Sequence, residues 1–200
     1  MKKDPLINPT REQVLGLAAS VEGGMGLLAL VFSSVFGFVL FPDFVLNPSV
    51  LSLSIVLTIP VLCLFMTVRL LPFETVQITN TTMDELLKPI IKPCSFGDLA
   101  VISILAGLGE EMLFRGVLQY TLYEQIGPYA SIIAVGLLFG ATHYISMFYA
   151  ILATSMGIYL GSLFFITENL WVPTIVHSFY DFVILVILKI RWQKVTEETT

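Results

Sequence analysis

The ionisable side chains inside long apolar runs are the residues with which this chain could do chemistry. In GEEMLFRG, two adjacent carboxylates and an arginine interrupt an apolar stretch. Both histidines of the chain lie in other apolar runs, in the sequences FGATH and HSFYD. A charged side chain costs about 2.5 kcal/mol or more at the centre of a membrane helix, so such residues usually face the protein interior and have a function. The full set is Glu22, Glu110, Glu111, Arg115, His143, His177 and Asp181.

Helical spacing assigns the first partners within this set. Glu111 and Arg115 are four residues apart on one helix face, and an acid on the N-terminal side of a base is the favoured order for an ion pair. Glu110 points about 100° away from Glu111 around the helix. We therefore predict that Glu111 neutralises Arg115 and that Glu110 stays free.

The remaining groups include carboxylates that suit a base and histidines that suit hydrogen-bond donors. His177 and Asp181 are four residues apart, as are Phe139 and His143, so each pair shares a helix face. For Glu22 we favour a structural role, because no residue near it in the sequence suggests another.

Composition identifies the class of protein that must position these residues. Of 200 residues, 56% are hydrophobic and 12% are charged, and the mean hydropathy of +0.88 is typical of an integral membrane protein. A net charge of −5 without a basic cluster excludes nucleic acid as a partner. Cys63 and Cys94 lack metal-binding or redox spacing, and we interpret them as ordinary thiols. The apolar run from Val14 to Phe41 is too long for a signal peptide, so it is predicted to be a retained span.

Apolar windows predict an all-α fold, a polytopic membrane helix bundle of about six transmembrane helices. We expect one integral membrane domain over residues 1–200, in which residues 98–190 form the motif-bearing core. The windows lie at about 13–41, 50–71, 98–120, 129–146, 148–166 and 170–190.

The longest polar connection, about residues 72–97, is expected to hold a short interfacial amphipathic helix. Thr82-x-x-Glu85 has the spacing of a capping box and would begin this helix. Ser95-x-x-Asp98 predicts the start of the third span. Close packing of the fourth and fifth spans is indicated by Gly136, Gly140, Gly157 and Gly161.

The distribution of basic residues predicts the orientation. Cytoplasmic loops carry an excess of Lys and Arg. If the spans alternate from a cytoplasmic N-terminus, the cytoplasmic side receives every basic residue except Arg115, and the other side receives only Asp43, Glu124 and Glu168. Both termini are therefore expected in the cytoplasm. His143 would then lie near the cytoplasmic side of the membrane and His177 nearer the outer side. One span boundary must therefore shift by about a turn if the two histidines are to meet.

Three motifs resemble, in order and approximate spacing, those of the CPBP family of intramembrane proteases. This family comprises the CAAX-processing, Rce1-like and bacteriocin-processing or Abi-type enzymes. EEMLFR matches Glu-Glu-x-x-x-Arg, FGATH matches Phe-x-x-x-His, and HSFYD matches His-x-x-x-Asn/Asp, within about residues 95–190. The resemblance implies an endopeptidase that cleaves a membrane-associated or lipidated protein or peptide in the bilayer. At the matching positions, Glu111 and Arg115 would order the site.

The resemblance also implies catalytic roles for the other matching residues. Glu110 would be the general base that activates water, and His143 would hold and polarise that water. His177 and Asp181 would stabilise the oxyanion or, in a metalloprotease, complete a set of metal ligands.

Asp181 departs from the Asn of the best-studied branch of the family, and an ionised aspartate cannot donate a hydrogen bond. Asp181 is therefore protonated, or orients His177, or helps to bind a metal. Two histidines and carboxylates suit Zn²⁺, with Glu110, His143, His177 and Asp181 as candidate ligands. The alternative mechanism uses glutamate and histidine without a metal, and neither version needs an organic cofactor.

Two other functional classes stay open. A non-catalytic membrane scaffold or bacteriocin-immunity protein would retain the polar cluster as a structural core. A proton-coupled transporter would use the buried carboxylates, but it would be favoured by an inverted repeat, and we find none in the sequence. A short chain with about six spans is more typical of a prokaryotic cell membrane.

Overall fold

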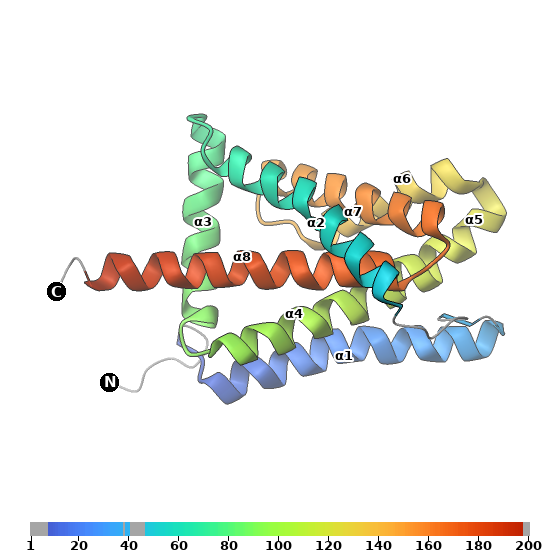
Figure 1. The fold of residues 1–200 in the computed structure, drawn as a ribbon, viewed down its shortest axis with the longest axis horizontal. Helices are drawn as coiled ribbons and strands as arrows, with labels where there is room; N and C mark the ends of the chain where they lie inside the picture. The colour runs from blue at the N-terminus through green and yellow to red at the C-terminus, as the bar shows by residue number, and fades with distance from the viewer. Residues whose placement is uncertain (1–7, 38, 41–46, 198–200) are drawn as a thin grey trace.

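The computed structural model describes residues 8–37, 39–40 and 47–197, and the described residues form helices and connections without a strand (Figure 1). Within these described ranges, eight α-helices and one π-helix follow one another. They are α1 (Arg11–Phe36), α2 (Pro48–Arg69), α3 (Glu74–Ile91), α4 (Phe96–Glu111), η1 (Met112–Gln119), α5 (Tyr120–Ile126), α6 (Pro128–Thr142), α7 (Met147–Thr167) and α8 (Trp171–Glu197).

The predicted polytopic helix bundle is confirmed, and the chain is an integral multi-pass membrane protein. α1, α2, α7 and α8 are each long and apolar enough to cross a membrane. The predicted third span is the continuous helix of α4, η1 and α5, and the predicted fourth span is the shorter apolar helix α6. α1 ends at Phe36, where Gly37 takes the left-handed conformation, with φ of 75°. Residue 41, Asp43 and the first seven residues, used in the span and charge predictions, lie outside the described residues.

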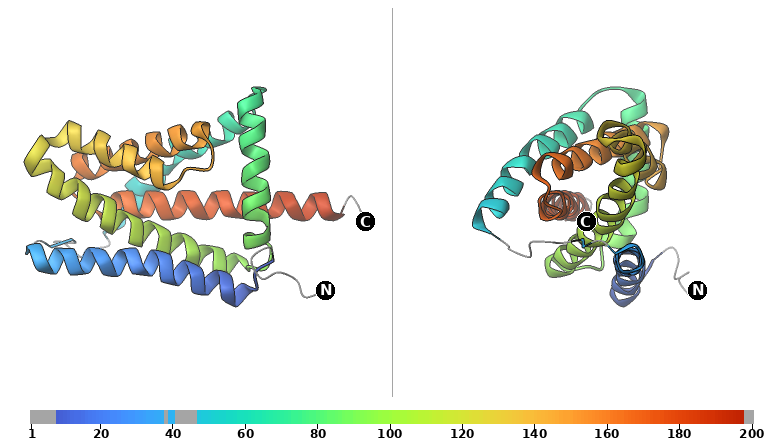
Figure 2. Two further views of the ribbon diagram at one scale, coloured as in Figure 1. Left: turned by 180° about the vertical axis from the view of Figure 1, so that it is seen from behind. Right: turned by 90° about the vertical axis from the view of Figure 1, so that its right-hand side faces the viewer.

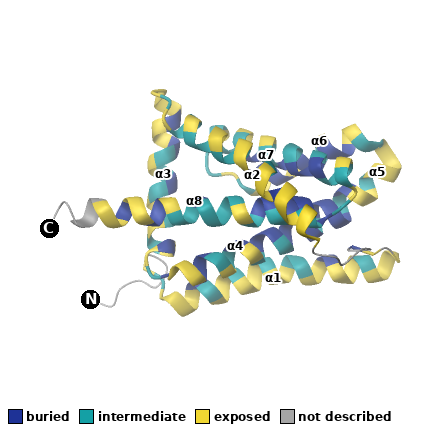
Figure 3. Ribbon diagram, viewed as in Figure 1, coloured by how far each residue is buried: buried dark blue, intermediate teal, exposed yellow. Residues whose placement is uncertain are grey.

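The outer helices turn their apolar side chains outward, as a bilayer requires (Figure 3). In α2 the buried residues are Ser54 and Thr58, whereas leucines and isoleucines of this helix are exposed. Each of these two hydroxyls donates a hydrogen bond to the carbonyl four residues before it. The polar groups are thus satisfied inside the bundle, and the apolar surface faces lipid.

Helix α3 crosses one end of the bundle at a large angle to the other helices (Figures 1 and 2). Its axis and that of the α4–α5 helix differ by 113°. The predicted amphipathic helix therefore exists, but the predicted capping box is wrong, because α3 begins at Glu74 and contains Thr82 and Glu85 in its interior. The Thr82 hydroxyl instead donates to the carbonyl of Ile78.

A contact from α8 holds the turn between α3 and α4. The ammonium of Lys189 in α8 donates to the carbonyls of Ile91 and Lys92, which lie at the C-terminal end of α3 where a cation is favoured. Cys94 is buried in this turn, and burial raises the pKa of its thiol. Cys63 and Cys94 are both free, as predicted.

The capping box at the start of α4 is confirmed. The Ser95 hydroxyl accepts a hydrogen bond from the Asp98 backbone, and the Asp98 carboxylate accepts one from the Ser95 backbone. The same carboxylate also accepts two hydrogen bonds from the Arg11 guanidinium, at 2.7 and 2.6 Å. This ion pair joins the start of α1 to the start of α4.

The predicted close packing of α6 and α7 is also confirmed. A Cβ atom on Gly157 would lie 3.0 Å from the Cα atom of Gly136, and one on Gly140 would lie 2.6 Å from the carbonyl oxygen of Ala150. Larger residues at these positions would push the two helices apart.

Candidate active site

The predicted site residues converge in the bundle interior from α4, η1, α8 and the connection after α6. Seen along the bundle, α8 lies between α2 and α4 (Figure 2), and it packs against both. The residues brought together are Glu110, Glu111, Arg115, His143, His177 and Asp181.

Glu111 contacts two basic side chains through one oxygen. Its Oε1 atom lies 2.8 Å from Nη1 of Arg115 and 2.8 Å from Nδ1 of His177. Arg115 also donates from Nη2 to the carbonyl of Gly157, at 2.9 Å. The side chains of Glu111 and Arg115 are fully buried. The predicted ion pair is confirmed, and Glu111 in addition fixes the ring of His177, which the sequence did not predict.

The ring of Phe139 connects both histidines to Arg115. It stacks on the ring of His143 with the centroids 4.3 Å apart and meets the ring of His177 edge-on at 5.9 Å. The guanidinium carbon of Arg115 lies 4.7 Å from the centroid of Phe139, within the range of a cation–π interaction.

A carboxylate oxygen of Glu110 faces a ring nitrogen of His143. Nδ1 of His143 lies 2.8 Å from the carbonyl oxygen of Phe139. Since a carbonyl only accepts, Nδ1 carries a proton, and in the neutral ring Nε2 holds the lone pair. Nε2 lies 3.6 Å from Oε2 of Glu110, which is buried and has no hydrogen-bond partner. A water molecule beside this gap would contact both atoms.

The early end of α6 explains how the two histidines meet. The predicted fourth span reached residue 146, but α6 ends at Thr142, which is the expected shift of about one turn. The carbonyl of Phe139 accepts from the Thr142 hydroxyl and from His143 Nδ1. These side-chain bonds compete with continuation of the helix. Ser146 then caps the start of α7.

Asp181 lies beside Nε2, the second ring nitrogen of His177. Its Oδ2 atom is 3.6 Å from Nε2 of His177, and 30% of its side chain is exposed. Because Glu111 already holds Nδ1, the main orienting contact of His177 comes from Glu111.

The predicted metal ligands do not fit a zinc site in this arrangement. Among the described residues, no three His, Cys, Asp or Glu side chains are placed to hold one metal ion. Zinc binds nitrogen and oxygen ligands at about 2.0–2.2 Å and usually needs three or more protein ligands. Nδ1 of His177 is occupied by Glu111.

A cavity of about 170 Å³ lies beside the histidines. It has room for several water molecules, since one water needs only about 10–15 Å³. Glu110 does not line this cavity but contacts His143, which does. Polar groups that line it are Arg69, Thr79, Asn80, His143, Tyr149, His177, Tyr180 and Asp181.

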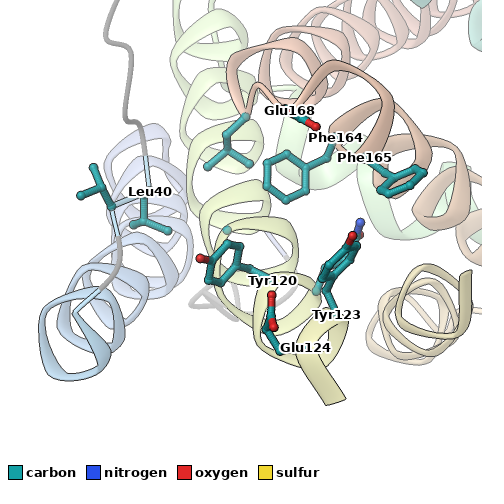
Figure 4. Close-up of a pocket in the computed structure, with 11 residues that line it drawn as sticks. Leu40, Tyr120, Tyr123, Glu124, Phe164, Phe165 and Glu168 are labelled. Atoms are coloured by element: carbon teal, nitrogen blue, oxygen red, sulfur yellow. The ribbon is translucent and has the colours of Figure 1, made fainter. Parts of the chain in front are cut away.

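A second, larger cavity of about 300 Å³ lies near α5 and the end of α7 (Figure 4), away from α3. Aromatic rings and two carboxylates line it, and it contains none of the predicted site residues. The second cavity therefore lies apart from the candidate site. The side chains labelled in the figure are Leu40, Tyr120, Tyr123, Glu124, Phe164, Phe165 and Glu168.

A family of known proteins matches the part of the chain that carries these residues. Residues 93–183 match the family described as type II CAAX prenyl endopeptidase Rce1-like. These residues form an Rce1-like family domain. The Rce1-like domain begins in the turn before α4, contains all of the predicted site residues and ends just after Asp181. Neither a curated protein nor a solved structure gives a match.

Glu22 of α1 joins the site although it lies outside the Rce1-like domain. Its Oε2 atom is buried without a hydrogen-bond partner, and α1 packs against α4, which carries Glu110. A Cβ on Gly109 would overlap with the Glu22 carbonyl oxygen, so the glycine before Glu110 allows the close approach of α1. The sequence signal was a lone carboxylate in a membrane span.

The π-helix η1 directly follows Glu111 and carries Arg115. Such segments frequently occur at functional sites, because they shift side chains relative to an α-helix. Gln119 at its end donates to the carbonyl of Gly161, at 2.9 Å. The apolar pattern of the Rce1-like domain does not reveal this change of helix type.

Proposed function

We propose that this protein is an intramembrane endopeptidase that hydrolyses a peptide bond of a membrane-associated protein or peptide. The Rce1-like family domain supports this class of reaction. The observation that carries the proposal is the buried, unpartnered Oε2 atom of Glu110, which faces Nε2 of His143 beside a cavity with room for several water molecules. Residues 98–190 would be the catalytic core of a single membrane domain.

In this mechanism Glu110 activates water. The water donates one hydrogen bond to Nε2 of His143 and gives its other proton to Glu110 as its oxygen attacks the scissile carbonyl carbon. Glu110 then gives this proton to the leaving amine when the carbon–nitrogen bond breaks. The products are a carboxylic acid and an amine.

In this mechanism His177 stabilises the oxyanion. Glu111 holds its Nδ1–H, so in the imidazolium form its Nε2–H is free to donate. Glu111 itself is held by Arg115, which bonds the Gly157 carbonyl of α7. Glu111 and Arg115 thus fix His177 relative to Glu110, which is the residue before Glu111 in α4. A protonated Asp181 would supply a second donor, as an Asn does.

We also propose that the end of the bundle that holds α3 faces the cytoplasm. α1 begins and α8 continues to its last described turn at this end (Figure 1). Basic residues gather there, which supports the orientation. The described ones are Arg11, Arg69, Lys88, Lys92, Lys189, Arg191 and Lys194.

Peptide profiling of cell membranes tests the proposed activity. Membranes that carry the natural protein, Glu110→Gln or the control Glu85→Gln at equal protein levels are compared for new N- and C-terminal peptides. Glu85 is exposed on α3, so its variant controls for loss of a carboxylate outside the site. We expect new ends with the natural protein and Glu85→Gln, and none with Glu110→Gln.

The same experiment separates the alternatives. If all three membranes give the same peptides while a phenotype depends on the protein, the scaffold or immunity function replaces the protease. A phenotype that follows the proton gradient, with unchanged peptides, would indicate a transporter.

A further inference from the structure

Arg69 brings an unpartnered guanidinium nitrogen to the cavity that holds the histidines. It is the last residue of α2, and only 12% of its side chain is exposed. Its Nη2 atom donates to Oδ1 of Asp84 at 3.3 Å, whereas its Nη1 atom is buried without a hydrogen-bond partner. Arg69 lines the same cavity as His143 and His177.

The charges around Arg69 do not balance. Asp84 of α3 also accepts a hydrogen bond from Arg191 of α8, so one carboxylate serves two guanidinium groups. This group of three residues has an excess of one positive charge. A buried N–H of a cation is costly to leave unpaired, which favours an anion as its partner.

Other contacts involve both the side chain and the backbone of Arg69. Its guanidinium carbon lies 5.5 Å from the ring centroid of Phe65, and Asn80 of α3 donates to its backbone carbonyl at 3.1 Å. The site for an anion is therefore formed before a ligand enters, which reduces the entropy lost on binding.

The walls of the cavity indicate which anion fits. Apolar side chains line the cavity alongside the polar ones, so an anion that is attached to an apolar group fits. A guanidinium binds carboxylates well because its planar N–H groups match their geometry. The apolar residues that line the cavity are Phe65, Val68, Val76, Met83, Phe139, Phe148, Leu152, Ala153 and Met156.

We propose that Arg69 binds a carboxylate of the substrate chain, and so selects peptides that carry one close to the bond that is cleaved. The carboxylate is either the C-terminus or an acidic side chain. This inference rests on the proposed peptidase function. Arg69 lies outside the matched residues 93–183, so the family comparison does not assign it.

Three synthetic peptides test the inference on the full-length protein in lipid vesicles. Each is a prenylated CAAX-type peptide with a labelled N-terminus. The first ends in methionine with a free carboxylate, the second is its C-terminal amide, and the third is an amide that ends in glutamate. We expect kcat/KM for the first or third peptide to exceed that for the second about tenfold or more.

Variants test whether Arg69 causes the preference for peptides with a carboxylate. In Arg69→Gln the ratio of kcat/KM between carboxylate and amide peptides is expected to fall close to one, and in Arg69→Lys to an intermediate value, because charge remains without the planar geometry. Arg191→Gln is the matched control, since Arg191 bonds the same Asp84 but does not line the cavity. It should keep the ratio of the natural protein.

The outcomes separate the two proposals. Equal cleavage of acid and amide by the natural protein, or a ratio that survives in Arg69→Gln, would reject the role of Arg69 and leave the peptidase function intact. Cleavage of none of the peptides would reject this substrate class and the role of Arg69 together. The comparison of acid and amide in the natural protein needs no variant, so poor folding of Arg69→Gln would not prevent the test.

Discussion

Replacing Arg115 by methionine should strongly destabilise the folded bundle, because it leaves the buried Glu111 carboxylate without its main counter-ion. Both side chains are fully buried, and their atoms are 2.8 Å apart. Removal of one partner from such a pair typically costs about 3–5 kcal/mol. The hydrogen bond from Arg115 to the Gly157 carbonyl is lost as well.

The expected magnitude lies at the lower end of this range. His177 already contacts the same oxygen of Glu111, and as an imidazolium it would replace part of the lost charge. We therefore expect a loss of about 3 kcal/mol in the free energy of unfolding. That is a large part of the total stability of an ordinary domain, about 5–15 kcal/mol.

A double-mutant cycle isolates the pair. The free energy of unfolding is measured by titration with SDS in mixed micelles for Arg115→Met, Glu111→Gln and the double variant. Because the double variant leaves no buried unpaired charge, its loss should be smaller than the sum of the single losses by about 2 kcal/mol. The control Arg191→Met removes a guanidinium that is 46% exposed and should cost less than about 1 kcal/mol.

Additive losses in this cycle would refute the reasoning, because they would show that Glu111 and Arg115 do not stabilise one another. A loss in Arg115→Met no larger than that in Arg191→Met would refute it too, since burial would then add nothing to the cost.

Two further predictions concern the approach of α1 to the site. Gly109→Ala should lower the free energy of unfolding by about 1–3 kcal/mol and lower Tm, since its Cβ would overlap the carbonyl of Glu22. Gly16→Ala, with no atom within 4 Å of the new Cβ, should not lower Tm. Glu22→Gln should raise stability by about 1 kcal/mol, because an unpartnered buried carboxylate is removed. It should also slow peptide cleavage, and lower stability with unchanged cleavage would indicate a purely structural Glu22.

Sequence patterns predicted the structural features that depend on residues close together in the chain. The apolar windows predicted the helices because each must satisfy its own backbone in lipid. The pair of Glu111 and Arg115 followed from the rise and turn of one helix, and the capping box at Ser95 from contacts three residues apart. The same pattern at Thr82 failed, because its hydroxyl bonds back to Ile78 within a longer helix.

The three motifs also predicted the family, which the match to residues 93–183 confirms. They did not predict the change to a π-helix after Glu111 or the end of α6 at Thr142. The π-helix and the end of α6 both depend on which backbone carbonyl accepts a hydrogen bond from which donor. Several such hydrogen-bond patterns have similar energies in an apolar segment.

The sequence predicted the close packing of α6 and α7 from their glycines, but the partners of the buried polar side chains across helices were decided by the tertiary structure. His177 lies 66 residues from Glu111 in the sequence yet shares its oxygen with Arg115, and Arg69 and Glu22 reach the site from helices outside the matched domain. The close approach of helices at Gly109 and at the glycines of α6 and α7 sets which side chains meet. The sequence by itself thus determined the helices and the chemical groups they carry, whereas packing determined their partners, because partner choice depends on distances between segments that no local spacing specifies.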